Sequence, residues 1–217
     1  MAKNTGHVVG IDIGTSKVAT IIAKVGEDGV VEVMGLGKAD SKGMRKGIIS
    51  SLDEVSACVK ASVEEAESQA GYPVERAYVG VGGCHIRGFN SRGVVAITSR
   101  ERLVGREDIA RVLEGARTIS FPQDQQIFHT FPQEYIVDDQ DGISRPEGMT
   151  GSRLEANVHV VTGSITSLQN IATVVNRTGI EVAEPVMNLM ADACAVLTPD
   201  EKEIGVALVN IGHGTTG

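Results

Sequence analysis

Two short segments with the same order of residue types lie near the two ends of the sequence. Residues 8–17 pass from a Val/Ile-rich run into Asp-Ile-Gly-Thr-Ser-Lys, and residues 206–216 pass from a similar run into Asn-Ile-Gly-His-Gly-Thr-Thr. Each pattern is typical of a β-hairpin whose turn combines glycine with hydroxyl residues. Such a turn presents consecutive backbone N–H groups and side-chain hydroxyls in a concave nest that suits phosphate oxygens. The two turns therefore predict two walls of a nucleotide cleft.

The composition limits the classes of function. The 217 residues carry 20 Lys and Arg against 28 Asp and Glu, a formal net charge of −8, so no nucleic-acid partner is expected. The cysteines, Cys58, Cys84 and Cys194, lie far apart without C-x-x-C spacing, so neither a disulfide framework nor a zinc site is predicted. No run approaches the roughly 20 apolar residues of a membrane span. We expect a soluble, cytoplasmic chain that binds proteins or small ligands.

Hydrophobic periodicity predicts an α/β body. Val/Ile-rich runs at 7–13, 17–25 and 30–37 predict a three-stranded antiparallel meander. Apolar residues spaced by three and four over 51–70, preceded by Ser51 with Glu54 in a capping box, predict a helix. The later part of the chain predicts, in order, a helix at 166–177, a strand at 180–183, a nearly all-buried helix from Pro185, and a strand at 204–211 in the same mixed sheet as 7–37.

The middle of the chain has a different pattern of predicted strands, helices and loops. The glycines of Tyr-Val-Gly-Val-Gly-Gly at 78–83 have the spacing of a dinucleotide-binding loop, but the residues that follow read as a strand, whereas that fingerprint requires a helix. Residues 84–164 predict a small inserted α+β subdomain that supplies no strand to the main sheet. Its expected elements are strands at 93–98, 125–130, 133–137 and 155–162, a helix near 106–117, and a polar surface loop at 138–151.

Together these segments resemble the first half of the FtsA family of actin-like bacterial cell-division proteins. The resemblance rests on the turn at 12–17, the strand at 78–83 before an inserted subdomain, and residues 195–216, and it covers nearly the whole chain. It implies an actin-like (ribonuclease H-like) ATPase lobe with a mixed sheet. Residues 1–83 and 165–217 would form subdomain 1A of that lobe, and residues 84–164 an inserted, SHS2-like subdomain 1C.

The resemblance also implies a site for ATP and Mg²⁺. Asp12 matches the aspartate that approaches Mg²⁺ through water, which suits a cation that keeps part of its hydration shell. The residues that match the phosphate contacts are Gly14, Thr15, Ser16, Lys17, Gly212, Gly214, Thr215 and Thr216, and with Asp12 they make up the expected cofactor-binding residues.

Three positions depart from the family pattern: Asn210 and Gly217 each stand for an aspartate, and His213 stands for a glycine. Because two carboxylates are replaced, nucleotide contact is expected more than hydrolysis, and no catalytic residue is assigned.

An FtsA-type role implies a scaffold that self-assembles through 84–164 and links the FtsZ ring to the membrane and to later division proteins, at the cytoplasmic face of the inner membrane. The 217 residues show no second lobe for adenosine and FtsZ, so we expect weak or no ATP binding and no measurable hydrolysis. They show no C-terminal membrane helix, so no liposome binding is expected. The face that the missing lobe would cover should be exposed and should favour self-association. Two alternatives stay open: a sugar or acyl kinase of the same superfamily, and an actin-like pilus-assembly protein.

Overall fold

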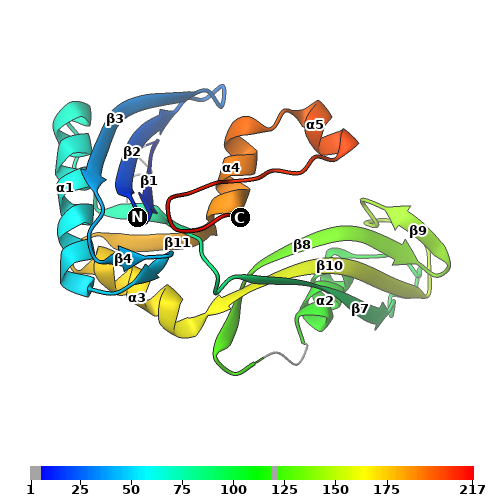
Figure 1. The fold of residues 1–217 in the computed structure, drawn as a ribbon. Coiled ribbons are helices and arrows are strands. Elements are labelled where there is room, and N and C mark those ends of the chain that lie inside the picture. The colour runs from blue at the N-terminus through cyan, green and yellow to red at the C-terminus, as the bar shows by residue number, and fades with distance from the viewer. Residues whose placement is uncertain (1–5, 119–121) are drawn as a thin grey trace. The chain divides into compact units, whose positions relative to one another are not determined.

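A computed structural model describes residues 6–118 and 122–217, which form two compact units (Figure 1). The first unit contains the described residues up to His85 together with Thr166–Gly217, and the second contains the described residues of Ile86–Ile165. The second unit is therefore an insertion between two parts of the first.

The first unit is built on a five-stranded mixed sheet. The predicted meander is present as β1 (His7–Ile13), β2 (Lys17–Val25) and β3 (Val31–Asp40). β6 (Arg76–Val81) runs parallel to β1, and β11 (Glu181–Met187) runs parallel to β6, which gives the order β11-β6-β1-β2-β3. The carboxyl ends of three parallel strands therefore lie together at one edge, where α/β sheets commonly bind ligands.

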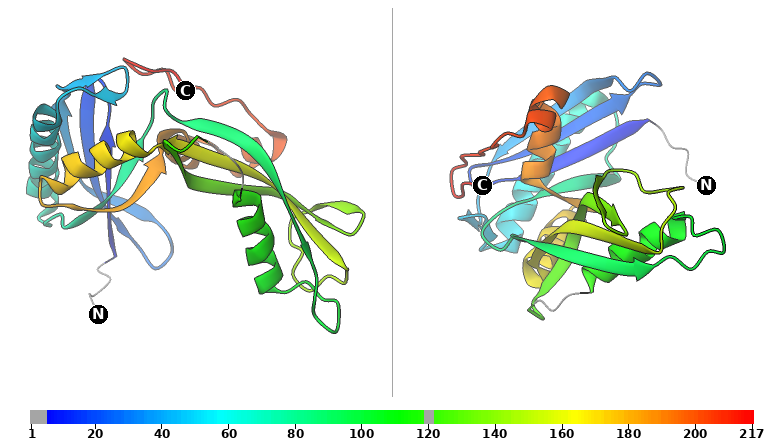
Figure 2. Two further views of the ribbon diagram at one scale, coloured as in Figure 1. Left: turned by 90° about the horizontal axis from the view of Figure 1, so that it is seen from below. Right: turned by 90° about the vertical axis from the view of Figure 1, so that its right-hand side faces the viewer.

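Two helices lie together on the first unit (Figures 1 and 2). α1 (Leu52–Ala70) starts where Ser51 accepts a hydrogen bond from the Glu54 N–H and ends at Gly71, whose φ of 62° is left-handed. It packs on β2 and β3, where Thr20 and Ser62 form a buried hydrogen bond of 2.8 Å. α3 (Ile165–Asn176) lies beside α1, and the Ser56 hydroxyl of α1 donates to the Val174 carbonyl of α3 at 3.2 Å.

Alternation along the strands gives the sheet of the first unit a buried face and an opposite face. Val9, Ile11 and Ile13 of β1 are buried, so the residues between them point to the opposite face. Asp12 lies on that opposite face, in register with Gly80 of β6. The sheet therefore places the first candidate carboxylate away from the core and beside a strand position without a side chain.

The second unit is a four-stranded antiparallel sheet with one covering helix. Its order is β7-β10-β8-β9, from β7 (Arg87–Ala96), β8 (Gln125–Val137), β9 (Gln140–Ile143) and β10 (Arg153–Ser164). α2 (Arg106–Arg117) packs on one face. The core between them consists of Ile97, Val104, Val112, Ala116, Tyr135, Val137, Ile143, Leu154, Ala156, Val158 and Val160. β7 follows β6 without an intervening helix, which confirms that the glycines at 78–83 are not a dinucleotide loop.

Some predicted boundaries in the second unit are wrong. The separate strands expected at 125–130 and 133–137 are one strand, β8, whose pairing with β10 shifts register between Asn157 and Val158. The expected loop at 138–151 contains the short strand β9. The strand expected directly after residue 83 and the strand expected at 93–98 are likewise one strand, β7, which begins at Arg87 and ends at Ala96.

Three expectations for the last part of the chain are also wrong. Pro185 lies in β11, where an edge position tolerates proline, and the helix expected there is α4 (Asn188–Val196). α4 has no buried residue, although a nearly all-buried helix was expected, and Cys194 on it is exposed. Residues 204–211 do not join the sheet: α5 (Pro199–Ile204) ends at 204, and the only pairing beyond it within the described ranges is the bridge between Ile211 and Thr216.

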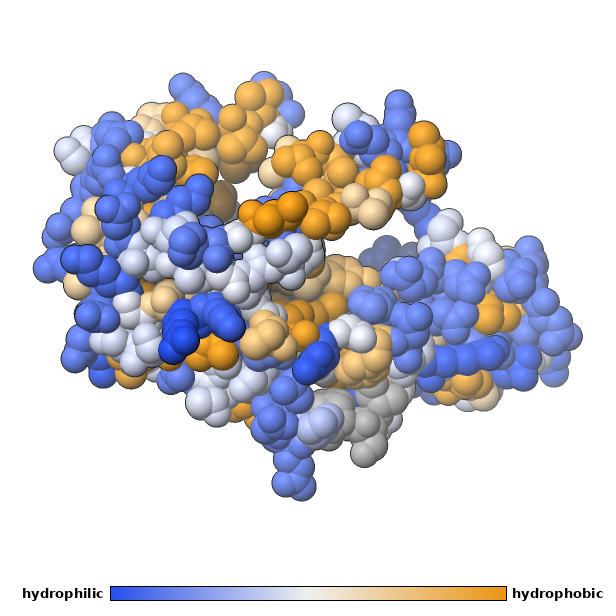
Figure 3. Space-filling view, in the orientation of Figure 1, coloured by the Kyte–Doolittle hydropathy of each residue, from blue (hydrophilic) through white to orange (hydrophobic). Residues whose placement is uncertain are grey.

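Exposed apolar side chains of the first unit gather over the β2–β3 hairpin and over residues 196–211 (Figure 3). The largest exposed fractions belong to Val30, Val31, Val33, Val196, Ile204, Val209 and Ile211. Surfaces of this kind favour contact with other protein surfaces. Among residues 6–118 and 122–217, the structure has no helix long and apolar enough to cross a membrane.

Asp108 gives a pH-dependent stability prediction for the second unit. Its carboxylate accepts the Gly105 N–H at 2.9 Å and pairs with Arg111. The Gly105 N–H chiefly holds the pKa of Asp108 below its ordinary value; burial opposes this, and Arg111 adds to it. Asp108→Ala is expected to destabilise this unit at pH 7 by about 1.5 kcal/mol, the lower end of the range for a hydrogen bond to a charged group.

The sign of the pH effect follows from the lowered pKa. The stabilisation by Asp108 is fully present above its unfolded-state pKa of about 4 and is lost as the pH falls through the lower folded-state pKa. Urea unfolding at several pH values should therefore show the difference between Asp108→Ala and the parent shrinking in acid. Glu107→Ala is the matched control, since Glu107 is exposed in the same helical turn. A difference that is constant with pH would contradict the prediction.

Candidate functional site

The two predicted turns have the same hydrogen-bond geometry. In the first, the Gly14 N–H donates to the Lys17 carbonyl at 2.9 Å; in the second, the Gly212 N–H donates to the Thr215 carbonyl at 2.9 Å. The second turn is closed at its base by two backbone hydrogen bonds between Asn210 and Gly217, of 2.9 and 3.0 Å. The similarity of the two sequence segments is therefore a similarity of backbone structure.

The two turns lie against each other in the first unit, although they are far apart in the sequence. A Cβ atom added to Gly214 would lie 2.6 Å from the Thr15 hydroxyl oxygen, so the backbone of the second turn directly faces the side chain of the first. The predicted meeting of the turns is confirmed. The prediction that residues 204–211 form a strand of the same sheet as 7–37 is wrong. These residues form an extended segment outside the sheet.

A third element at this place was missed by the sequence analysis. The hairpin of β4 (Met44–Arg45) and β5 (Ile48–Ile49) turns through Lys46 and Gly47, with left-handed φ values of 50° and 73°. The Gly47 N–H donates to the Thr15 hydroxyl at 3.1 Å, and a Cβ on Gly47 would lie 3.0 Å from the Thr215 methyl carbon. A glycine at the second turn position, followed by Ile48 and Ile49, is the local signal of this hairpin, and it is weak because no apolar run precedes the turn.

Asp12 is held by a residue that sequence reasoning did not select. The Asn188 side-chain N–H donates to Asp12 Oδ1 at 3.1 Å from the start of α4. Partial burial raises the pKa of Asp12; the Asn188 hydrogen bond lowers it, Asp192 raises it and Lys17 lowers it. Asp12 is nevertheless solvent-accessible, so its second oxygen can face a hydrated cation.

The second turn is held by the same helix. The Asn210 side-chain N–H donates to Asp192 Oδ2 at 2.6 Å, and a Cβ on Gly217 would lie 3.2 Å from a methyl carbon of Leu189. Asn210, where the resemblance implies an aspartate, therefore has a carboxylate partner on α4. His213 is exposed at the tip of the turn.

The predicted residues take different places in this arrangement. Thr15, Gly214 and Thr215 meet with the Gly47 hairpin, and Gly14 and Gly212 shape the turns. Ser16 and Lys17 are exposed beside Asp12's strand, and Thr216 pairs with Ile211.

This donor set fits magnesium and phosphate better than a metal held by protein alone. Backbone N–H groups, threonine hydroxyls and one lysine suit phosphate oxygens. Mg²⁺ commonly takes one or two carboxylates and completes its shell with water and phosphate, which a single accessible Asp12 can satisfy. In the described part of the chain, no three His, Cys, Asp or Glu side chains gather to hold a metal ion.

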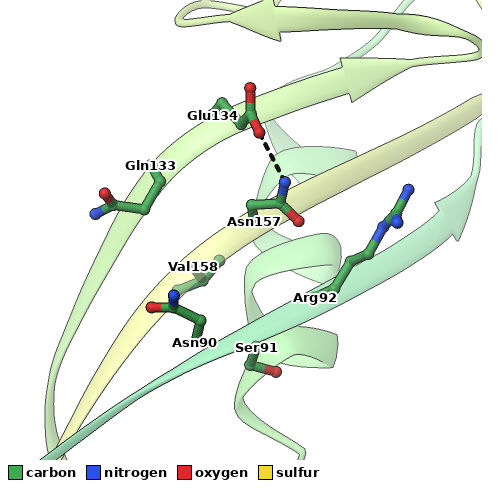
Figure 4. Close-up of a pocket in the computed structure, with 7 residues that line it drawn as sticks. All are labelled: Asn90, Ser91, Arg92, Gln133, Glu134, Asn157 and Val158. Atoms are coloured by element: carbon green, nitrogen blue, oxygen red, sulfur yellow. Dashed lines mark hydrogen bonds between the residues drawn. The ribbon is translucent and has the colours of Figure 1, made fainter.

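The second unit has a polar hollow of about 530 Å³ on its sheet (Figure 4). Asn157 donates to Glu134 at 2.8 Å within it, and Arg92 pairs with the buried Glu155 next to it. The residues that line it are Asn90, Ser91, Arg92, Gln133, Glu134, Asn157 and Val158. Amide and charged groups of this kind suit contact with a polar protein surface better than with an apolar ligand.

Comparison with known proteins finds similar proteins for both units of the chain. The family described as "SHS2 domain inserted in FTSA" matches residues 83–162. Cell division protein FtsA of Pseudomonas aeruginosa is 46% identical over 96% of this chain, and that of Borreliella burgdorferi is 41% identical over 96%. The chain belongs to the FtsA family. It spans about half the length of these FtsA relatives, 50% and 51% respectively.

The fold class is confirmed by the same comparisons. A solved PilM–PilN type IV pilus biogenesis complex matches 86% of this FtsA-family chain and 49% of that chain, with a TM-score of 0.57 at 13% identity. At that identity the likeness concerns the fold alone. With the SHS2 match, it supports the predicted actin-like lobe with a mixed sheet and a small inserted α+β subdomain.

Proposed function

We propose that this chain is the phosphate-binding half of an FtsA-type cell-division scaffold. Its two turns would hold the phosphates of ATP, with Asp12 contacting Mg²⁺ through water. The observation that carries the proposal is the direct contact between two turns of identical hydrogen-bond geometry, at Gly214 and Thr15. With the two turns in contact, their backbone N–H groups and hydroxyls and the Asp12 carboxylate would face one place. Such a set of groups suits a phosphate with a bound Mg²⁺.

The predicted site residues have distinct roles in this proposal. Gly14 and Gly212 shape the two nests, Thr15 and Thr215 place hydroxyls between them, and Lys17 adds a compact positive charge. The other proposed phosphate contacts are Ser16, Gly214 and Thr216. Mg²⁺ would neutralise phosphate charge and orient the phosphates. No residue is assigned to hydrolysis, and nucleotide is proposed to regulate assembly.

The second unit would carry protein contacts. We propose subdomain 1A for residues 1–83 and 165–217 and subdomain 1C for residues 84–164, with self-association through 84–164. The polar hollow and the network around Glu155 support a protein-contact role for its sheet. As an FtsA-type protein, this chain would have FtsZ and later division proteins as partners. It would act at the cytoplasmic face of the inner membrane. The SHS2 match favours this role over a sugar or acyl kinase.

Nuclear magnetic resonance can test the phosphate site at the weak affinity we expect. Titration of the ¹⁵N-labelled chain with millimolar ATP and Mg²⁺ should shift amide resonances at 12–17, 46–47 and 210–217. The affinity should be weak, because the contacts at this exposed site are directed to phosphate and much nucleotide affinity comes from burial of the base and ribose. AMP with Mg²⁺ is the matched control, since it lacks the β- and γ-phosphates. Shifts confined to the second unit, or equal shifts with AMP, would contradict the proposal.

A further inference from the structure

Gly80 of β6 and Gly82 just after it leave room for the side chain of Asn188. A Cβ on Gly80 would lie 2.5 Å from Asn188 Oδ1 and 3.2 Å from Asp12 Oδ1. A Cβ on Gly82 would lie 3.2 Å from Asn188 Nδ2. The glycine pattern at 78–83, which does not form a dinucleotide loop, therefore opens a slot that the Asn188 amide fills beside Asp12.

Asn188 and Asp192 lie four residues apart on α4, so they project from the same side of the helix. Asn188 donates to Asp12 beside the first turn, and Asp192 accepts from Asn210 at the base of the second turn. Leu189 also packs against Gly217, at the other side of that base. One helix therefore contacts the strand before the first turn and the base of the second turn through the side chains of Asn188, Leu189 and Asp192.

We propose that α4 fixes the two turns relative to each other, with Asn188 positioning the Asp12 carboxylate and Asp192 positioning Asn210. Both are positioning residues, because they act through Asp12 and Asn210. The consequence for metal and phosphate binding rests on the proposed function, but the mechanical link between α4 and the turns does not.

The proposal explains why position 210 carries an amide in this chain. The Asn210 amide nitrogen and the Asp192 carboxylate lie at hydrogen-bond distance, so an aspartate at 210 would place two carboxylates side by side. Like charges at that distance repel and are costly unless one of them takes a proton. Asn210 and Asp192 thus form a matched donor–acceptor pair, and exchanging the two residue types should preserve it.

The link can be tested without ligand by amide hydrogen exchange. Asn210→Asp, which sets two carboxylates against each other, and Asp192→Ala, which removes the acceptor, should each lower protection of the Asn210 and Gly212 backbone amides about tenfold, which equals the loss of roughly 1.4 kcal/mol of local stability. The exchanged pair Asp192→Asn with Asn210→Asp should restore protection to within about twofold, because the donor and acceptor are again opposite each other. Asp200→Asn, on the exposed turn of α5, is the matched control.

The second arm tests Asn188 with Mg²⁺ and ATP as the probes. In the parent, Mg²⁺ should enhance the ATP-induced shifts at residues 12–17. Asn188→Ala should reduce that Mg²⁺ enhancement about tenfold and leave the shifts with ATP alone nearly unchanged, a separation that general unfolding would not produce. Asn176→Ala, at the exposed end of α3, is the control.

The outcomes separate this inference from the proposed function. An exchanged pair that stays as poorly protected as Asn210→Asp would overturn the link to the second turn. Asn188→Ala with parental Mg²⁺ enhancement would overturn the link to the first. If the parent itself shows no ATP response, the proposed function fails, and the Asp12 amide shift and exchange rate in ligand-free Asn188→Ala decide the Asn188 contact: a parental shift and rate would overturn it.

Discussion

Gly37→Ala is expected to destabilise the first unit by about 3 kcal/mol, at the upper end of the cost of overfilling a packed core. A Cβ at this β3 position would overlap the carbonyl oxygen of Ser62 and lie 2.8 Å from the Ala66 backbone nitrogen, both on α1. Because these atoms belong to helical backbone, no flexible side chain can move aside. α1 must separate from the sheet, which also opens the buried hydrogen bond between Thr20 and Ser62.

Urea unfolding followed by amide resonances of the first unit measures this loss. Gly10→Ala is the matched control, since Gly10 also lies within a strand of the same sheet but a Cβ there would meet nothing within 4 Å. The control should stay close to parental stability. If Gly37→Ala and Gly10→Ala unfold at the same urea concentration, the close approach of α1 to β3 is not as described.

The second unit uses the same packing principle. A Cβ on Gly93 of β7 would overlap the Val112 carbonyl oxygen and lie 2.9 Å from the Ala116 nitrogen of α2. In each unit, a helix approaches its sheet over a strand glycine. Sequence periodicity identified both helices but did not reveal these approaches, because a glycine in a strand is equally compatible with a bulge, a bend or a close contact.

The parts of the fold that were predicted have strong local signals. The meander at 7–37 has alternating Val and Ile with glycine turns, and α1 has a clear cap, an apolar stripe and a terminal glycine. The segment at 204–211 has the apolar composition of a strand, but a strand also needs a partner, and composition does not supply one. β11 extended through Pro185 because pairing with β6 outweighed the helical pattern there.

The site was predictable to the extent that it lies in one local motif. The repeated turn indicated two nests, and the structure brings them together at Thr15 and Gly214. The Lys46–Gly47 turn and Asn188 reach the same place from other elements, and no local pattern connects them with Asp12 or Thr15. Asn188 follows β11 directly, so its place beside Asp12 depends on the parallel pairing of β1, β6 and β11, which only the complete fold defines.

Gly214→Ala is expected to reduce the response to ATP and Mg²⁺ at least tenfold, which is the largest effect on the proposed site from one added methyl group. Its Cβ would lie 2.6 Å from the Thr15 hydroxyl oxygen, 2.9 Å from the Thr15 methyl carbon and 3.0 Å from the Lys46 Cα. Thr15 is itself held by the Gly47 N–H, so it cannot rotate away without losing that hydrogen bond. The second turn must therefore move outward, and the two nests no longer converge.

The same titration with ATP and Mg²⁺ measures the effect, and His213→Ala is the matched control. His213 is the exposed neighbour of Gly214 in the same turn, so removing its side chain should leave the response close to that of the parent. Without ligand, Gly214→Ala should already shift the Gly47 amide resonance, because that N–H reports on the position of Thr15. A displaced second turn would leave only the first turn to bind phosphate, so the ATP response should fall. If Gly214→Ala instead keeps the parental Gly47 resonance and the parental ATP response, the two turns do not act together.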